Sequence, residues 1–211
     1  FRLFKLKNPK CKAKLLLHTN FAEGWNIPSL VEEKGIDPND ILCTYYCPKC
    51  KRYEVKPFQG QKLDCRFCGA KESQNTVSIV NGISEPQLNE IYNLMDVYCH
   101  AFTSGGQEIP IQEAKLCEII TLVTNYSCGE DMCTDESGGF PLKWSEYREP
   151  GTQFIKASTC PQDISKNLTK VFKMDSLKKA SLGKKARDYV INNYSIDVIG
   201  KKIEDILDAM A

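Results

Sequence analysis

The fold is decided by residues 96–124, which read DVYCHAFTSGGQEIPIQEAKLCEIITLVT. The apolar stretches 96–102 and 119–124 predict two short strands, and the stretch between them predicts a helix over 110–118 that begins at Pro110. A strand, a helix and a second strand in this order are typical of a parallel sheet. We therefore expect the α/β fold class, with a Rossmann-like parallel sheet flanked by helices.

The same alternation extends in both directions from this stretch. Ser84 and Gln87 form a predicted capping box, and Asp175 and Ser195 are predicted helix caps. The other predicted strands are 13–19, 40–46, 76–80 and 154–157, and the other predicted helices are 27–34, one capped by Ser84, 161–173, 175–193 and 195–209.

The glycine-containing loop between the first strand and the helix is a candidate ligand site. Backbone N–H groups at a helix start carry about half a positive charge. Gly105 and Gly106 allow the main chain to approach a ligand closely. Ligands of open α/β folds bind at the carboxyl ends of the strands, so the loop predicts a site for a phosphate-bearing nucleotide. Glu113 lies one turn into the helix, where its carboxylate can accept hydrogen bonds from a ribose.

Four cysteines predict a second site of a different kind. Cys47, Cys50, Cys65 and Cys68 form two CxxC pairs separated by fourteen residues, a spacing typical of structural Zn²⁺. A site closed by four thiolates has no open position for chemistry. Residues 47–72 are too few for a hydrophobic core, so the metal is expected to supply most of the folding energy of this inserted zinc ribbon. The predicted domains are 1–46 and 73–211, with 47–72 inserted.

Composition limits the function classes. The 211 residues include 28 basic and 27 acidic side chains, for a net charge of +1, which argues against nucleic acid as a partner. No apolar run reaches the roughly 20 residues that a membrane helix needs. Eleven cysteines, four of them in a metal motif, fit a reducing compartment, so we expect a cytoplasmic protein.

Residues 1–46 and 75–211 resemble the C-terminal, nucleotide-sugar-binding half of a family 4 retaining glycosyltransferase with the GT-B fold. The resemblance lies in residues 96–98 (DVY), the glycine loop, 110–114 (PIQEA), 122–124 (LVT), 186–190 (ARDYV) and 192–195 (NNYS). It implies transfer of a sugar from a nucleoside diphosphate sugar to an acceptor, with retention of configuration. It also implies an acceptor-binding domain N-terminal to this chain, without which the chain is expected to be inactive.

The resemblance also assigns site residues. Glu113 matches a glutamate that contacts the ribose, and the main-chain amides of Glu108 and Ile109 match those that contact the diphosphate. The base-binding region matches Gly82, Ile83 and Leu88. The complete set of expected nucleotide-sugar contacts is Ser104, Gly105, Gly106, Gln107, Glu108, Ile109, Glu113, Gly82, Ile83 and Leu88.

One position departs from the family pattern. The glutamate that normally touches the donor sugar falls on Gly105, which leaves Gln107 and Glu108 as candidates for that contact. His100, in the strand before the loop, is interpreted as a packing residue. An alternative function is a non-catalytic binding or scaffold protein that uses the zinc ribbon for a protein or nucleic-acid partner. The cations around the cysteines favour that alternative less, because they can simply offset the −2 charge of a four-thiolate zinc site.

Overall fold

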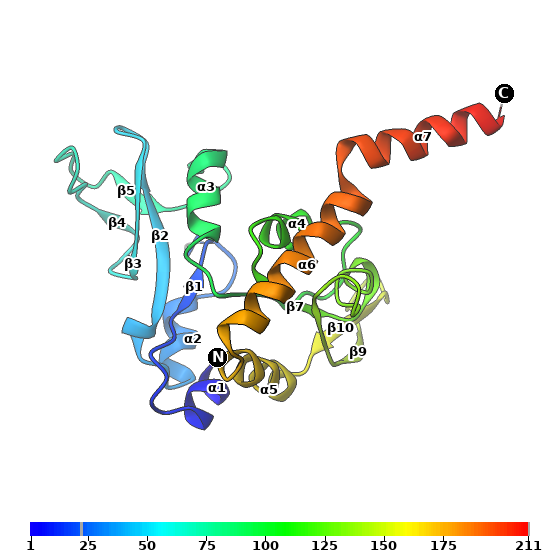
Figure 1. The fold of residues 1–211 in the computed structure, drawn as a ribbon. Coiled ribbons are helices and arrows are strands. Elements are labelled where there is room, and N and C mark those ends of the chain that lie inside the picture. The colour runs from blue at the N-terminus through cyan, green and yellow to red at the C-terminus, as the bar shows by residue number, and fades with distance from the viewer. Residues whose placement is uncertain (22, 211) are drawn as a thin grey trace. The chain divides into compact units, whose positions relative to one another are not determined.

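The computed structural model describes residues 1–21 and 23–210, which form a mixed α/β protein (Figure 1). The chain divides into two compact units, Phe1–Leu88 and Asn89–Ala211. The strands belong to three small sheets rather than to one continuous sheet. No helix within the described residues is both long enough and apolar enough to cross a bilayer.

The first unit is built around strand β2 (Ile41–Cys47), which lies in a mixed five-stranded sheet. On one edge, β2 pairs in parallel with β1 (Leu15–Leu17) and then antiparallel with β5 (Gln74–Thr76). The other edge pairs antiparallel with β3 (Arg52–Pro57). The remaining elements are α1 (Arg2–Lys7), α2 (Ile27–Glu33), a 3₁₀ turn (Pro38–Asp40), β4 (Lys62–Leu63) and the first half of α3 (Glu85–Tyr92).

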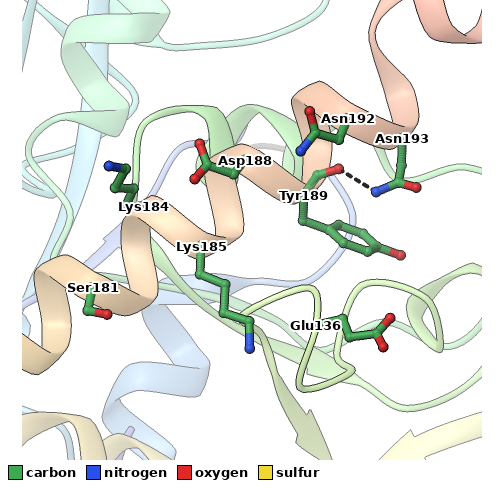
Figure 2. Close-up of a pocket in the computed structure, with 8 residues that line it drawn as sticks. All are labelled: Glu136, Ser181, Lys184, Lys185, Asp188, Tyr189, Asn192 and Asn193. Atoms are coloured by element: carbon green, nitrogen blue, oxygen red, sulfur yellow. Dashed lines mark hydrogen bonds between the residues drawn. The ribbon is translucent and has the colours of Figure 1, made fainter.

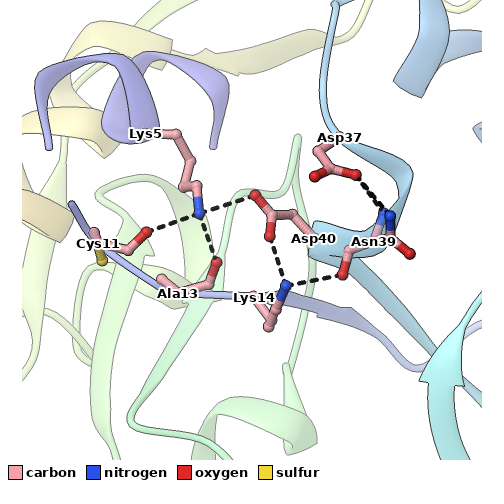
Figure 3. A network of polar contacts seen from close by, with 7 residues as sticks. All are labelled: Lys5, Cys11, Ala13, Lys14, Asp37, Asn39 and Asp40. Carbon is pink, nitrogen blue, oxygen red and sulfur yellow. Dashed lines mark hydrogen bonds and ion pairs between the residues drawn. The ribbon is translucent and has the colours of Figure 1, made fainter. Parts of the chain in front are cut away.

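A partly exposed carboxylate connects the first segments of this unit (Figure 3). Asp40 accepts from Lys14 Nζ at 2.8 Å and pairs with Lys5 Nζ at 2.9 Å. Lys5 also donates to the carbonyls of Cys11 and Ala13. The hydrogen bond from Lys14, followed by that from Lys5, lowers the pKa of Asp40 below its ordinary value. This network therefore connects α1, the segment before β1 and the start of β2.

The second unit contains the predicted strand–helix–strand segment. Strands β6 (Val97–His100), β7 (Ile120–Thr124) and β8 (Phe140–Leu142) form a parallel sheet, and α4 (Ile109–Leu116) connects β6 to β7. The other elements are a 3₁₀ turn (Ser127–Gly129), an antiparallel hairpin of β9 (Trp144–Arg148) and β10 (Ile155–Thr159), and helices α5 (Pro161–Phe172), α6 (Ser176–Tyr194) and α7 (Ile196–Met210).

Both faces of the parallel sheet are covered by helices. Alternate residues of β7 point to opposite faces: Val123 packs in a cluster with Ile111 of α4, and Leu122 packs with Val171 of α5. Figure 1 shows α4 and α6 packed together over β7. Continuous burial of all five residues of β7 follows from this coverage, as expected for a central parallel strand.

Two predicted strands differ from the structure. Strand β5 ends at Thr76, and the expected continuation to residue 80 is a turn in which Asn81 N donates to Ser78 Oγ. Ile79 and Val80 are exposed, so they lack the packing that a buried strand requires. The strand predicted over 154–157 is β10, and it pairs antiparallel with β9 outside the parallel sheet.

Candidate functional site

The four cysteine sulfurs lie together in the first unit, within 4.8 Å of one another. The Sγ atoms of Cys47 and Cys68 are 3.9 Å apart, and those of Cys50 and Cys65 are 3.6 Å apart. Four sulfurs bound at about 2.3 Å to a tetrahedral zinc ion lie about 3.8 Å from one another. The donor set and the spacing of the sulfurs therefore fit one Zn²⁺.

Two similar turns position these cysteines. In the first turn, which joins β2 to β3, Lys51 N donates to Cys47 O at 2.8 Å, and Lys51 adopts a positive φ of 57°. In the second turn, Gly69 N donates to Cys65 O at 2.8 Å, with a φ of 70° at Gly69. Each turn brings the two cysteines of one pair to the same side, as metal-binding CxxC turns require.

The electrostatics of the cluster favour the thiolate at Cys47 but not at Cys50, whose pKa burial raises to about 12. Burial alone would raise the pKa of Cys47, but hydrogen bonds from Ser73 and from the backbone amides of Cys50 and Lys49 lower it to about 6. Zinc binds the thiolate rather than the thiol. Cys47 is therefore prepared to bind in its charged form.

The predicted nucleotide loop lies in the second unit, between the end of β6 and the start of α4. Ser104, Gly105 and Glu108 are half-buried, whereas Gly106, Gln107 and Ile109 are exposed. Ser127 Oγ donates to Gly105 O at 2.7 Å and fixes the loop. A Cβ atom added at Gly106 would meet no heavy atom within 4 Å, so the main chain is open to solvent there.

Glu108 immediately precedes α4, but its side chain does not cap the helix. Its carboxylate instead lies 3.0 Å from His100 Nε2, and His100 Nδ1 lies 2.9 Å from Tyr98 Oη. A Cβ atom added at Gly105 would collide with the Glu108 carboxylate. Glu108 thus occupies the space that a side chain at position 105 would need, and His100 has polar partners in addition to its packing contacts.

Glu113 points toward a polar partner. Its carboxylate accepts a hydrogen bond of 2.8 Å from the hydroxyl of Tyr92, at the end of α3. Burial, followed by the hydrogen bond to Glu113, raises the pKa of Tyr92 above its ordinary value, so the phenol stays protonated and donates. Because Glu113 is only half-buried, its carboxylate retains access to other donors.

The remaining predicted contacts are the main-chain amides and the base-binding residues. Of the two amides predicted to meet the diphosphate, that of Glu108 already donates to the Cys128 sulfur, whose pKa is raised by burial and then by the Glu108 charge. Gly82, Ile83 and Leu88 belong to the first compact unit, and their role in holding a base stays a prediction.

The sequence reasoning missed one cation beside the loop. Lys156, on β10, donates from Nζ to Ser104 Oγ at 2.8 Å, and its other ionic contact is Glu149 at 3.7 Å. The backbone amide of Ala157 donates to Thr103 O at 2.8 Å, which attaches β10 to the start of the loop. Because 52 residues separate Lys156 from Ser104, no local motif connects them.

A separate surface hollow lies along α6 (Figure 2). None of the predicted site residues contributes to it. Asn193 Nδ2 donates to Tyr189 O within the helix. The lining residues that define it are Glu136, Lys184, Lys185, Asp188, Tyr189 and Asn192.

Comparisons of the sequence with known protein families and with curated proteins found no match. No family model matches the chain, and no curated protein matches it significantly.

Proposed function

We propose that this chain is the donor-binding domain of a retaining glycosyltransferase that uses a nucleoside diphosphate sugar. The observation that carries the proposal is the loop between β6 and α4, together with the Glu113 carboxylate one turn into the helix. The parallel β6–α4–β7 unit supports the proposal, since open α/β folds bind ligands at this edge of the sheet. In its full form, the proposal is the C-terminal half of a GT-B enzyme with an inserted zinc ribbon.

Three groups around the loop suit a diphosphate and its ribose. The start of α4 has no side-chain cap, and the Ile109 amide is the group that it offers to an anion. The Glu108 amide donates to the Cys128 sulfur, Pro110 has no N–H, and Ile111 N donates to Glu108 O at 3.1 Å. Lys156 adds a positive charge beside Ser104. Glu113, oriented by Tyr92, offers a carboxylate oxygen to a ribose diol. Glu108, held by His100, is the acidic group closest to Gly105 and is the candidate for the contact with the sugar.

The chemical contribution of this half is electrostatic. Negative charge accumulates on the diphosphate as the glycosidic bond to the donor breaks, and fixed donors and cations at the loop stabilise that charge. The acceptor and the groups that bind it are proposed to belong to a further, N-terminal domain. Zinc has a structural role in this scheme. None of the eleven cysteines in the described chain forms a disulfide, which supports a reducing, cytoplasmic location.

Isothermal titration calorimetry of the zinc-loaded chain against UDP, GDP and their sugar conjugates tests the proposal. We expect one of the two diphosphates to bind at one site per chain. Glu113→Gln should weaken that binding by about tenfold, as expected for loss of a hydrogen bond to a charged group worth about 1.5 kcal/mol. Glu32→Gln removes the same charge from an exposed position on α2 and serves as the matched control. Absence of binding by the wild-type chain would refute the proposed function.

A further inference from the structure

The net positive charge of this protein comes from the zinc ribbon. Residues 47–72 hold seven of the 28 basic side chains but three of the 27 acidic ones, a net charge of +4. Four thiolates and one Zn²⁺ add −2, which leaves the metal-loaded ribbon at +2. The rest of the chain then carries −3, from 21 basic and 24 acidic residues. The whole-chain charge of +1 is therefore an average over two oppositely charged regions.

An aromatic ring lies among these cations. The exposed fraction of Phe67 is 36%, and two guanidinium groups lie near its ring. The Cζ atom of Arg66 is 4.8 Å from the ring centroid, and that of Arg52 is 5.4 Å from it. Arg52 comes from the other cysteine turn, where it pairs with Cys47 across the β2–β3 ladder. Arg52, Arg66 and Phe67 thus bring the two turns together. We call them, with the exposed Lys49 and Lys51 of the first turn, the ribbon face.

Part of this charge is not neutralised by neighbouring carboxylates. Arg66 is paired with Glu54 at 2.9 Å, which fixes its guanidinium beside the ring. In contrast, Lys49, Lys51 and Arg52 form no ion pair with any carboxylate in the described part of the chain. The metal site offsets two of the four net positive charges, so the ribbon keeps a net charge of +2 for a ligand.

We propose that the ribbon face binds single-stranded nucleic acid, with a base stacked near Phe67 and phosphates held by Lys49, Lys51 and Arg52. An exposed aromatic ring with guanidinium planes beside it offers flat surfaces on which an unpaired base can stack. An acidic peptide has no base to stack, so it would bind through the positive charges alone. A base within a duplex is already stacked and cannot reach the ring. The ligand class is therefore a single strand rather than a duplex or a polyacid.

The same geometry makes binding depend on the metal. Arg66 and Phe67 lie between the ligands Cys65 and Cys68, and Lys49 lies between Cys47 and Cys50. Zinc holds both turns, so it also sets the positions of the groups that would contact the strand.

Fluorescence anisotropy of a labelled 20-nucleotide oligouridylate tests this proposal with the zinc-loaded full chain. Three phosphate contacts predict a slope of about −2 in a plot of log K against log salt concentration. Phe67→Ala should weaken binding by roughly 5- to 100-fold, the range for loss of one base–aromatic stack. Phe154→Ala removes another exposed ring, outside the ribbon, and should leave binding unchanged.

A charge-matched pair of variants locates the phosphate contacts. Lys49→Ala/Lys51→Ala should flatten the salt slope by about 1.4. Lys184→Ala/Lys185→Ala removes two charges from α6 and should not change the slope. Retention of one zinc per chain in each variant confirms that the ribbon is folded.

Three results would overturn the proposal. The first is absence of binding at 50 mM salt. The second is competition by polyglutamate, or by a duplex of the same length, that equals competition by the unlabelled single strand. The third is a loss of affinity in the α6 double variant as large as that in Lys49→Ala/Lys51→Ala. Binding that survives removal of zinc would overturn its metal dependence. The proposal does not rest on nucleotide-sugar binding, so either function can fail without the other.

Discussion

A buried lysine on α4 gives a sharp test of the structure around the proposed donor site. Lys115 is fully buried and donates from Nζ to the Ser137 carbonyl. Burial lowers the pKa of Lys115 from its ordinary value of 10.5 to about 8. A shift of this size means that burying the charged amine costs about 3 kcal/mol near neutral pH. Lys115→Met removes that cost but leaves the Ser137 carbonyl without its donor, a loss of about 1–3 kcal/mol.

The pH dependence separates these contributions. Between the folded and unfolded pKa values, the unfolded state binds more protons at Lys115, so the wild-type free energy of unfolding rises with pH. From pH 7 to 9.5 this gain is about 2 kcal/mol, and the Lys115→Met variant lacks it. At pH 7 the variant should be no less stable than the wild type, because the free-energy cost of burying the charged amine equals or exceeds that of leaving the Ser137 carbonyl without a donor.

Urea unfolding of both proteins at several pH values measures the difference. A Trp25→Phe background leaves Trp144, whose indole donates to the Asn125 carbonyl, as the single reporter for the second unit. Trp25 is highly exposed, so its replacement should have little effect on stability. A difference in unfolding free energy that does not change between pH 7 and 9.5 would show that Lys115 is not buried as a charged amine.

Three further predictions concern the rest of the fold. Gly183→Ala should destabilise the second unit by about 1–3 kcal/mol, because the added methyl group collides with the Glu118 carbonyl. Gly200→Ala places its methyl group in open space and should not lower the stability. Equal melting temperatures of the two variants would contradict this prediction. Asp40→Asn should cost about 1–3 kcal/mol at pH 7. Since the Asp40 pKa is lowered in the folded state, that cost should disappear as the pH falls through the folded pKa. A difference in the free energy of unfolding between wild type and variant that does not change with pH would argue against the paired carboxylate. Elemental analysis should find about one zinc per wild-type chain and almost none in the Cys65→Ser variant. In that variant, hydrogen-exchange protection should fall in the ribbon but not in β7. A metal-free wild type would refute the site.

Local sequence signals predicted most helices. Gln87 accepts from the Ser84 backbone amide at 3.0 Å, which confirms the capping box, and Asp175 accepts from Lys178 N at 2.8 Å, which confirms that cap. These contacts depend on residues three positions apart, so the sequence contains all the information that they need. The CxxC spacing predicted the cysteine cluster for the same reason, since each pair is a local turn.

The strands were harder to predict because their partners are distant. Strand β9 is mostly exposed and follows a stretch rich in Gly, Asp, Glu and Ser, so it has no apolar alternation to reveal it. Ile79 and Val80 show the opposite case, in which apolar β-branched residues remain exposed in a turn. Lys156 was missed at the candidate site because 52 residues separate it from Ser104, and its strand β10 meets the loop only in the folded chain, where Ala157 N donates to Thr103 O.

The central claim is that the loop between β6 and α4 holds the diphosphate of a nucleotide. Hydrogen exchange of the zinc-loaded chain, with and without saturating UDP or GDP, tests this most directly. The account predicts slower exchange of backbone amides in residues 104–113 and around Lys156. Unchanged exchange in that loop, with protection confined to another surface such as the hollow along α6, would contradict it.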